Sequence, residues 1–185
     1  MHGITVRPET AEDVRAIDVV NLSAFEGEEE ARLVSALRRS SGFIPQLSLV
    51  AEFHGRIVGH VMLSRVELRR LETSQEILAL APMSVVPSQS HRGIGSELVR
   101  AALRQAGALG YGAVVESGQP DYYERLGFRR AAAWKLTCNL PVPDAMLTAM
   151  ELQEGLLAGG GHVIYPSPFI EAFRYLERPI KSTEW

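Results

Sequence analysis

The segment Met83–Leu98, MSVVPSQSHRGIGSEL, is typical of an apolar strand that passes through a short loop into a helix whose first residues include two glycines. Beyond the loop, apolar residues recur every three or four positions, which predicts an amphipathic helix over 93–109. A helix start presents unpaired backbone N–H groups and the positive end of the helix dipole, and both attract anions. The segment therefore predicts a phosphate-binding loop.

Two phosphate ligands fit this loop poorly. A mononucleotide P-loop requires G-x-x-x-x-G-K-[ST], and neither Gly-Lys-Ser nor Gly-Lys-Thr occurs in the chain. A dinucleotide site requires G-x-G-x-x-G directly after the first strand, but Leu98 occupies the third glycine position and Pro87 to Arg92 separate the strand from Gly93. Glu116 has the spacing of a ribose-binding acid, yet the two departures from the dinucleotide pattern count against that ligand. Coenzyme A, whose pyrophosphate also needs a helix start, is the third candidate and fits better.

A second informative segment is Pro120–Phe128, PDYYERLGF, which follows the strand-like run 112–116. Gly127 is expected to be the C′ residue of a short helix, with a positive φ, and Phe128 is expected to begin the next strand. Either segment alone would be compatible with an ordinary junction between a helix and a strand, whereas the pair at this separation is far more specific.

Together these segments resemble the GNAT superfamily of N-acetyltransferases. Val85–Leu98 is similar to its acetyl-CoA signature [Q/R]-x-x-G-x-[G/A], with Ser90 in the Gln/Arg position, and Pro120–Phe128 is similar to its Y-E-x-L-G-F segment. The opening strand with a capping-box-like Thr10–Asp13, and a hairpin that turns at His54-Gly55, agree with the resemblance. The resemblance is strong over residues 3 to 130 and weaker from 131 to 185. It is particularly close to one branch of the superfamily, which carries a Pro-x-Tyr-Tyr segment.

The resemblance implies an α/β fold with a GNAT-like central mixed, mostly antiparallel sheet, helices on both faces, and a splay between strands 4 and 5. Residues 1–185 are expected to form a single acyl-CoA N-acyltransferase domain. Pro82 lies within an apolar strand and removes one ladder donor, which predicts a bulge or a strand unpaired on one side. The expected elements are helices over 11–24, 28–39, 93–109 and 120–126, and strands over 3–7, 48–54, 56–68, 75–86, 112–116, 128–137, 145–152 and 162–165.

The resemblance also implies a cofactor site that holds acetyl-CoA as co-substrate. The pantetheine arm would pair with the strand at Met83, Ser84 and Val85, and the N–H of Val85 would stabilise the oxyanion. The pyrophosphate would be held by the loop residues His91, Arg92, Gly93, Ile94, Gly95 and Ser96.

Two residues are candidates for catalysis. Tyr123 matches the general acid of the family, and its proton would go to the leaving thiolate; Tyr122 is expected to pack or to line the substrate side. Glu116 interrupts an apolar strand and is the candidate general base, although a solvated strand end would also explain a glutamate at this position. Deprotonation of the amine through water, without a dedicated base, is a further alternative. Cys138 lies outside both segments, so direct attack in a ternary complex is expected, without a covalent acetyl-enzyme.

The resulting hypothesis is an N-acetyltransferase that transfers acetyl from acetyl-CoA to a primary amine. The alternative is a non-catalytic acyl-CoA-binding sensor or interaction module, which the departure at Ser90 keeps open. A small metabolite, an antibiotic, a peptide N-terminus and a protein lysine remain possible acceptors, and a homodimer is possible because dimers are common in the superfamily.

Composition excludes several other classes. The 185 residues carry a net charge of −3 and no basic tract, so no nucleic acid partner is expected. No signal pattern or long apolar run is present, which predicts a cytoplasmic protein without a membrane partner. One cysteine and five scattered histidines, His2 among them, favour no metal. The acidic run 26–30 could line the route of a cationic amine, but its position at a helix start favours a solvated cap.

Overall fold

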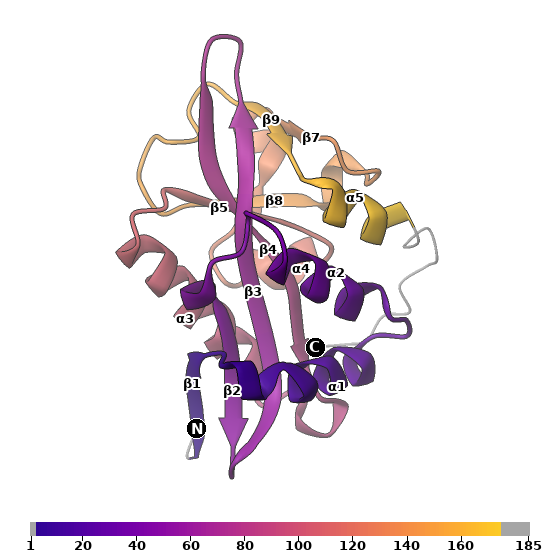
Figure 1. Cartoon of the computed structure of the whole chain (residues 1–185). Coiled ribbons are helices and arrows are strands. Elements are labelled where there is room, and N and C mark those ends of the chain that lie inside the picture. The colour runs from indigo at the N-terminus through magenta and orange to yellow at the C-terminus, as the bar shows by residue number, and fades with distance from the viewer. Residues whose placement is uncertain (1–2, 175–185) are drawn as a thin grey trace.

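The computed structural model describes residues 3–174, which form a nine-stranded sheet with helices on both faces (Figure 1). The sheet order is β1-β2-β3-β4-β5-β8-β6, while β9 pairs with the far half of β3 and with β7. All pairings are antiparallel except β4–β5 and β7–β9, so the prediction of a mixed, mostly antiparallel sheet is confirmed. His2 and the two ends of the expected 1–185 domain lie outside the described residues.

The strands are β1 (Ile4–Pro8), β2 (Ser48–Phe53), β3 (Arg56–Arg69), β4 (Ser74–Val85), β5 (Ala113–Ser117), β6 (Arg129–Arg130), β7 (Leu136–Cys138), β8 (Leu147–Glu151) and β9 (Gly161–Ile164).

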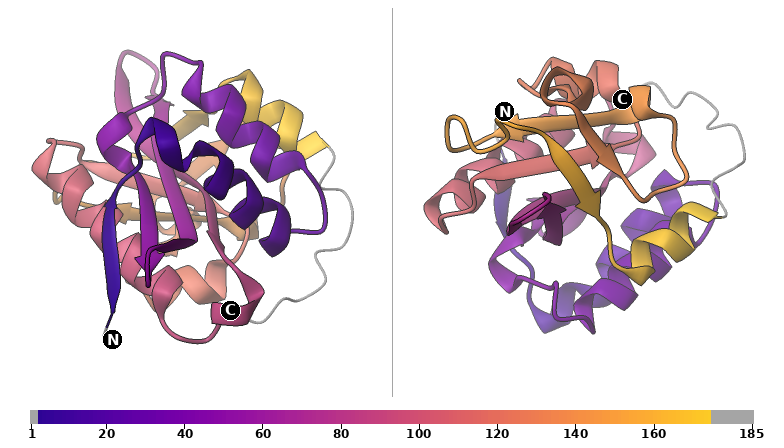
Figure 2. Two further views of the ribbon diagram at one scale, coloured as in Figure 1. Left: turned by 60° about the horizontal axis from the view of Figure 1, so that its bottom comes forward. Right: turned by 90° about the horizontal axis from the view of Figure 1, so that it is seen from above.

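Helices cover the two faces of the sheet in separate groups (Figures 1 and 2). On one face lie α1 (Val14–Ala24), α2 (Glu29–Arg38) and α5 (Ser167–Arg174), and on the other lie α3 (Ile94–Ala108) and α4 (Pro120–Glu124). Each group buries apolar side chains against its own face of the sheet, which is the main source of stability for such layers. Because α5 packs beside α2, the C-terminal part of the described chain is brought next to the N-terminal helices.

The long strand β4 changes the facing of its side chains at Pro82. Leu78 and Leu80 pack toward α3, and after Pro82 it is the odd-numbered Met83 and Val85 that pack there. The register between β3 and β4 shifts at this point, which is the signature of a β-bulge. The irregularity predicted from Pro82 is therefore confirmed.

The local turns predicted for the first half of the chain are also present. His54 and Gly55 both have positive φ values, 49° and 74°, as a two-residue hairpin turn requires. Thr10 and Asp13 form the capping box: the backbone N–H of Thr10 donates to the Asp13 carboxylate at 2.7 Å.

A buried polar network joins the end of β1 to β2, β3 and α2. Arg38 donates to both carboxylate oxygens of Glu9, at 2.7 and 2.9 Å. The Ser48 hydroxyl donates to the same carboxylate, and its oxygen lies 2.9 Å from Nε2 of the fully buried His60. Burial alone would raise the pKa of Glu9, but the hydrogen bonds from Arg38, His60 and Ser48 overcome it and lower the pKa to about 2.

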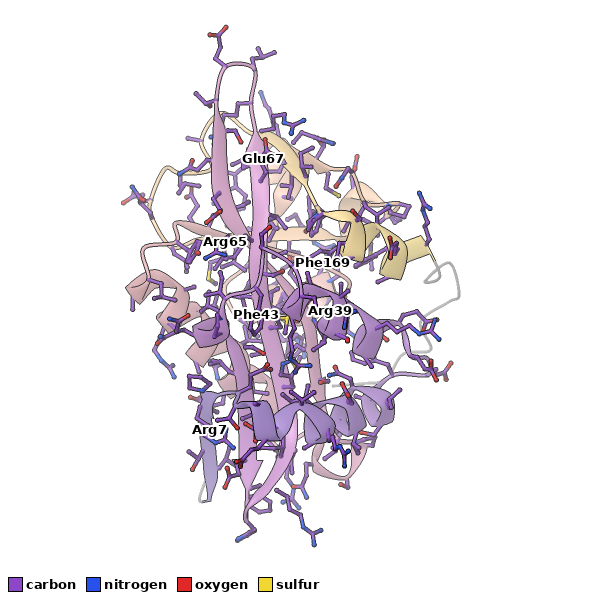
Figure 3. All side chains as sticks on the ribbon, in the orientation of Figure 1. Arg7, Arg39, Phe43, Arg65, Glu67 and Phe169 are labelled. Atoms are coloured by element: carbon purple, nitrogen blue, oxygen red, sulfur yellow. The ribbon has the colours of Figure 1, made fainter. Side chains whose placement is uncertain are left out.

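The loop that follows α2 is fixed to the sheet by Arg65 of β3. Its guanidinium donates to the carbonyl groups of Ser41 at 2.8 Å and Phe43 at 3.4 Å (Figure 3). These contacts hold the loop between α2 and β2 against the sheet. Within the described part of the chain, no helix is long and apolar enough to cross a membrane.

The C-terminal third departs from the predicted elements. The single strand expected over 128–137 is wrong: the structure has the short β6, a 3-10 turn over Ala131–Trp134, and then β7. Three consecutive alanines have little strand propensity, and Lys135, with a φ of 57°, ends the turn in the left-handed region. The helix α5 was not predicted at all, although Ser167-Pro168 with Phe169 and Ala172 three residues apart is a helix-start pattern.

Candidate active site

The sheet opens between β4 and β5. The two parallel strands pair only at Leu78 with Val114 and at Ala79 with Val115, and they separate beyond these residues. On the other edge of β4, the Val86 N–H donates to the Val58 carbonyl at 2.9 Å. Because N–H direction alternates along a strand, the N–H groups of Met83 and Val85 face the opening. The predicted splay between strands 4 and 5 is confirmed.

A first cavity, of about 210 Å³, lies where β4 leads into α3, and we call it the cofactor cavity. At its edge His91 and Gly93 have positive φ values, 62° and 74°. The first backbone bond of α3 runs from the Glu97 N–H to the Gly93 carbonyl at 3.0 Å, so the preceding amides are the unpaired ones of a helix start. The cofactor cavity is lined by Met83, Val85, Gln89, Ser90, His91, Gly93, Ile94, Gly95, Ser96 and Tyr122.

Most of the predicted cofactor residues are brought together in this cavity, and two are not. Ser84 is fully buried opposite His60, since neighbouring residues of a strand point to opposite faces. Arg92 is exposed and is not among the lining residues. Gln89 and Tyr122 line the cavity although the sequence did not single them out as cofactor contacts.

The space at Gly95 is limited. A Cβ atom at this position would lie 3.0 Å from Met83 Sδ and 3.0 Å from the Tyr122 hydroxyl. Such contacts are tighter than those of ordinary side chains, so a glycine keeps the floor of the cofactor cavity open for a ligand. The helix start and this floor fit a pyrophosphate group.

A second cavity, of about 160 Å³, lies on the far side of Met83, and we call it the acceptor cavity. Met83 lines both cavities, so they meet at this residue on the open edge of β4. The remaining lining comes from the α1–α2 connection, α2, β4, the end of β5, α4 and α5: Phe25, Glu29, Glu30, Leu33, Leu80, Ala81, Pro82, Glu116, Ser117, Gly118, Gln119, Tyr123, Ala172 and Phe173.

Glu116 lies at the acceptor cavity and is 5% exposed, so the solvated strand end considered from the sequence is wrong. The Thr148 hydroxyl on β8 donates to its carboxylate at 3.1 Å, and the Gln119 backbone N–H is a further donor. Burial dominates these hydrogen bonds and raises the pKa of Glu116 to about 8. A carboxyl of this kind exchanges a proton near neutral pH.

The two consecutive tyrosines face different cavities. Tyr123 is 5% exposed, lines the acceptor cavity and packs edge-on against Phe128, with ring centroids 5.3 Å apart. Burial, and then the Glu116 charge, raise the pKa of Tyr123 well above its usual value, so its hydroxyl keeps its proton. Tyr122 lines the cofactor cavity instead of the substrate side, with its hydroxyl 3.3 Å from Ser96 Oγ.

From the sequence, the acidic run 26–30 was weighed as a lining of the amine's route but a helix cap was favoured, and the contribution of α5 was missed. Glu29 and Glu30 lie in the first turn of α2, as expected of a helix cap, and they also line this cavity. Ala172 and Phe173 come from the unpredicted α5. Among residues 3–174, no group of three His, Cys, Asp or Glu side chains is arranged to hold a metal ion.

An open strand edge beside a glycine-containing helix start is the arrangement that the resemblance to the acyl-CoA-binding GNAT superfamily implies. Known proteins support this resemblance. The family model of the acetyltransferase (GNAT) domain matches residues 45–130. The uncharacterized N-acetyltransferase YjhQ of Escherichia coli strain K12 is 30% identical over 78% of this chain and 80% of its own length. This chain belongs to the GNAT family of N-acetyltransferases.

Two solved structures share the arrangement. The GNAT family N-acetyltransferase YhbS from Escherichia coli, in complex with CoA, is 30% identical and superposes with a TM-score of 0.84 over 90% of this chain and 92% of that one. A GNAT family acetyltransferase from Brucella melitensis, in complex with acetyl-CoA, is 28% identical with a TM-score of 0.73, covering 91% and 99% of the two chains.

Proposed function

We propose that this chain transfers the acetyl group of acetyl-CoA to a primary amine by direct attack in a ternary complex. The observation that carries the proposal is the meeting of two cavities at Met83, on a strand edge that pairs with no other strand among residues 3–174. Such an edge offers backbone donors to a pantetheine arm, and the two cavities could hold donor and acceptor at the same time. The relatives with CoA and acetyl-CoA support the choice of co-substrate.

The residues of the cofactor cavity would hold the co-substrate. The amides between His91 and Ser96 would bind the pyrophosphate at the start of α3. The N–H groups of Met83 and Val85 would pair with the arm, and that of Val85 would stabilise the oxyanion as the amine nitrogen bonds to the carbonyl carbon.

Tyr123 and Glu116 would move the protons. As the carbon–sulfur bond breaks, Tyr123 would donate its proton to the thiolate; burial raises the pKa of Tyr123 well above its usual value, so the transfer is uphill and the site must stabilise the tyrosinate as it forms. Glu116 would accept the proton of the attacking amine. With its pKa near 8, it lies much closer to an alkylamine, at about 10.4, than an ordinary carboxylate does.

Calorimetry with acetyl-CoA, followed by measurement of thiol release with a panel of amines, tests the proposal. We expect binding of acetyl-CoA and amine-dependent release of coenzyme A. The value of kcat/KM should rise with pH up to about 8 in the wild type, and the Glu116→Gln variant should lose this rise. Tight binding without thiol release for any amine would instead indicate the non-catalytic sensor, and no binding would exclude both functions.

A further inference from the structure

We propose that the acceptor is a small amine whose carbon skeleton is apolar and which carries no carboxylate or phosphate group. This inference rests on the proposed function and specifies the chemical class of its substrate. It is drawn from three properties of the acceptor cavity: its walls, its charge and its size.

The walls of the acceptor cavity are mainly apolar. Phe25, Leu33, Pro82 and Phe173 come from four separate parts of the chain and contribute apolar surface to the cavity. Removal of apolar surface from water would favour a hydrocarbon group at this place. A sugar or a peptide backbone would leave its polar groups without hydrogen-bond partners there.

The charged groups that line the cavity are all acidic. Glu29, Glu30 and Glu116 contribute carboxyl groups, whereas none of its lining residues from the described chain is an arginine, lysine or histidine. A bound carboxylate or phosphate would therefore meet the carboxyl groups of Glu29 and Glu30, and that of Glu116 once it ionises near its pKa of about 8, with no counter-ion, which is costly. An ammonium group would meet partners of opposite charge.

Polar groups line the acceptor cavity together with its apolar walls. Glu116 and Tyr123 are among them, and the buried hydroxyl of Ser117, another lining residue, has no hydrogen-bond partner among the described residues. A buried hydroxyl without a partner is rare in folded proteins, and an amine nitrogen would satisfy it. The amine would thus be held with its nitrogen near Glu116 and Ser117 and its apolar group against the apolar walls.

The size of the cavity limits the apolar group. Apolar cavities of about 150 Å³ hold one molecule the size of benzene. At about 160 Å³, the acceptor cavity accommodates one ring or a short alkyl chain. Arylalkylamines and short alkylamines fit, whereas an aminoglycoside is much too large.

Three compounds with one skeleton test this inference by acetyl-CoA-dependent thiol release. They are 2-phenylethylamine, L-phenylalanine, which adds a carboxylate, and L-phenylalanine amide, which adds a neutral group of the same shape. We expect 2-phenylethylamine and the amide to exceed L-phenylalanine in kcat/KM by about 100-fold, because only the acid brings an unpaired negative charge to the cavity. Equal use of L-phenylalanine would overturn the inference.

The same assay separates this inference from the proposed function. Spermidine, a lysine-containing peptide and an aminoglycoside are assayed in parallel. Transfer to any of these while 2-phenylethylamine is inert would overturn the apolar acceptor and leave the acetyltransferase intact. Binding of acetyl-CoA without transfer to any amine would overturn both.

Charge reversal at the cavity wall provides a second test. Glu30→Lys should narrow the preference for 2-phenylethylamine over L-phenylalanine by about tenfold, since it adds a cation beside the acceptor. Glu26→Lys changes an exposed glutamate of the same acidic run, outside the lining, and should leave the preference unchanged. If the melting temperature of Glu30→Lys is strongly lowered, Glu30→Gln takes its place and should also narrow the preference. A folded Glu30 variant with an unchanged preference would contradict the inference.

Discussion

Glu116 and Thr148 face each other across β5 and β8, and the Thr148 hydroxyl donates to the Glu116 carboxylate at 3.1 Å. This contact and the Gln119 backbone N–H hold a buried carboxyl group, and burial still outweighs both in setting the pKa of Glu116 at about 8. The pair therefore has a thermodynamic signature that can be measured without a substrate.

The Glu116→Gln variant should be more stable than the wild type at alkaline pH. Between its ordinary pKa of 4.5 and about 8, Glu116 keeps in the folded state a proton that it loses in the unfolded state, so the stability of the wild type falls as pH rises through this window. The variant lacks this loss, so its advantage in free energy of unfolding should grow by about 1 kcal/mol per pH unit. Urea denaturation from pH 5 to pH 9 measures it, with the exposed Glu72→Gln as control. A difference that does not vary with pH would show that Glu116 is not buried as described.

The Tyr123→Phe variant should bind acetyl-CoA like the wild type but turn over more slowly. The ring would keep its edge-on contact with Phe128 while the proton donor is lost, and general acids contribute about 10²- to 10⁴-fold. Calorimetry and thiol release measure the two effects separately. Tyr122→Phe is the matched control, since its hydroxyl lies at the cofactor cavity and its loss should act on affinity for acetyl-CoA. Unchanged turnover in Tyr123→Phe would remove this residue from the mechanism.

The Gly95→Ala variant should weaken binding of coenzyme A without destabilising the fold. The added methyl group would press on Met83 Sδ and the Tyr122 hydroxyl, while alanine itself favours a helix. Gly107→Ala lies in the same helix, where a Cβ atom would meet nothing within 4 Å, and should raise stability by up to about 1 kcal/mol with unchanged affinity. Thermal melting with and without coenzyme A compares the two. Equal affinity in both variants would place the ligand away from α3.

The Arg38→Ala variant should lose much more stability than Arg32→Ala. Arg38 pairs with Glu9 where both side chains are mostly buried, and removal of one partner of such a pair costs about 3 kcal/mol. Arg32 pairs with Glu28 on the exposed face of α2, where the cost is below about 1 kcal/mol. Chemical denaturation at neutral pH measures the difference. Similar losses in the two variants would mean that the buried network contributes little.

Low pH should weaken the same network. Glu9 has a pKa of about 2 in the folded protein against its ordinary 4.5, so its contribution is fully present above pH 4.5 and is lost as pH falls toward 2. An acid titration of stability should therefore show a steeper decline for the wild type than for Arg38→Ala. If stability declined equally steeply in the two proteins, the acid sensitivity would belong to other carboxylates.

The cofactor half of the site could be predicted from sequence because local rules determine it. Gly93 and Gly95 mark a helix start, and Pro82 marks the bulge that turns Met83 and Val85 toward α3. Ser84 was predicted as a cofactor residue because the whole run Met83–Val85 was assigned to the cofactor, whereas alternate residues of a strand face opposite sides and Ser84 is buried.

The acceptor half could not be predicted in the same way. Its lining joins Phe25 and Glu30 to Phe173, residues that are far apart in the chain and meet only because α5 packs beside α2. No spacing rule connects them. The raised pKa of Glu116 likewise depends on burial by distant elements, which periodicity does not show.

The shared position of Met83 has a consequence for how such proteins diversify. The cofactor cavity is lined by residues from within 83–96 together with Tyr122, whereas part of the lining of the acceptor cavity comes from α2 and α5. Changes in α2 or α5 could thus redirect the enzyme to new acceptors while its donor chemistry stays intact. A variant in which Ser167–Arg174 is replaced by an unrelated amphipathic helix would show whether acceptor selectivity depends on that one segment.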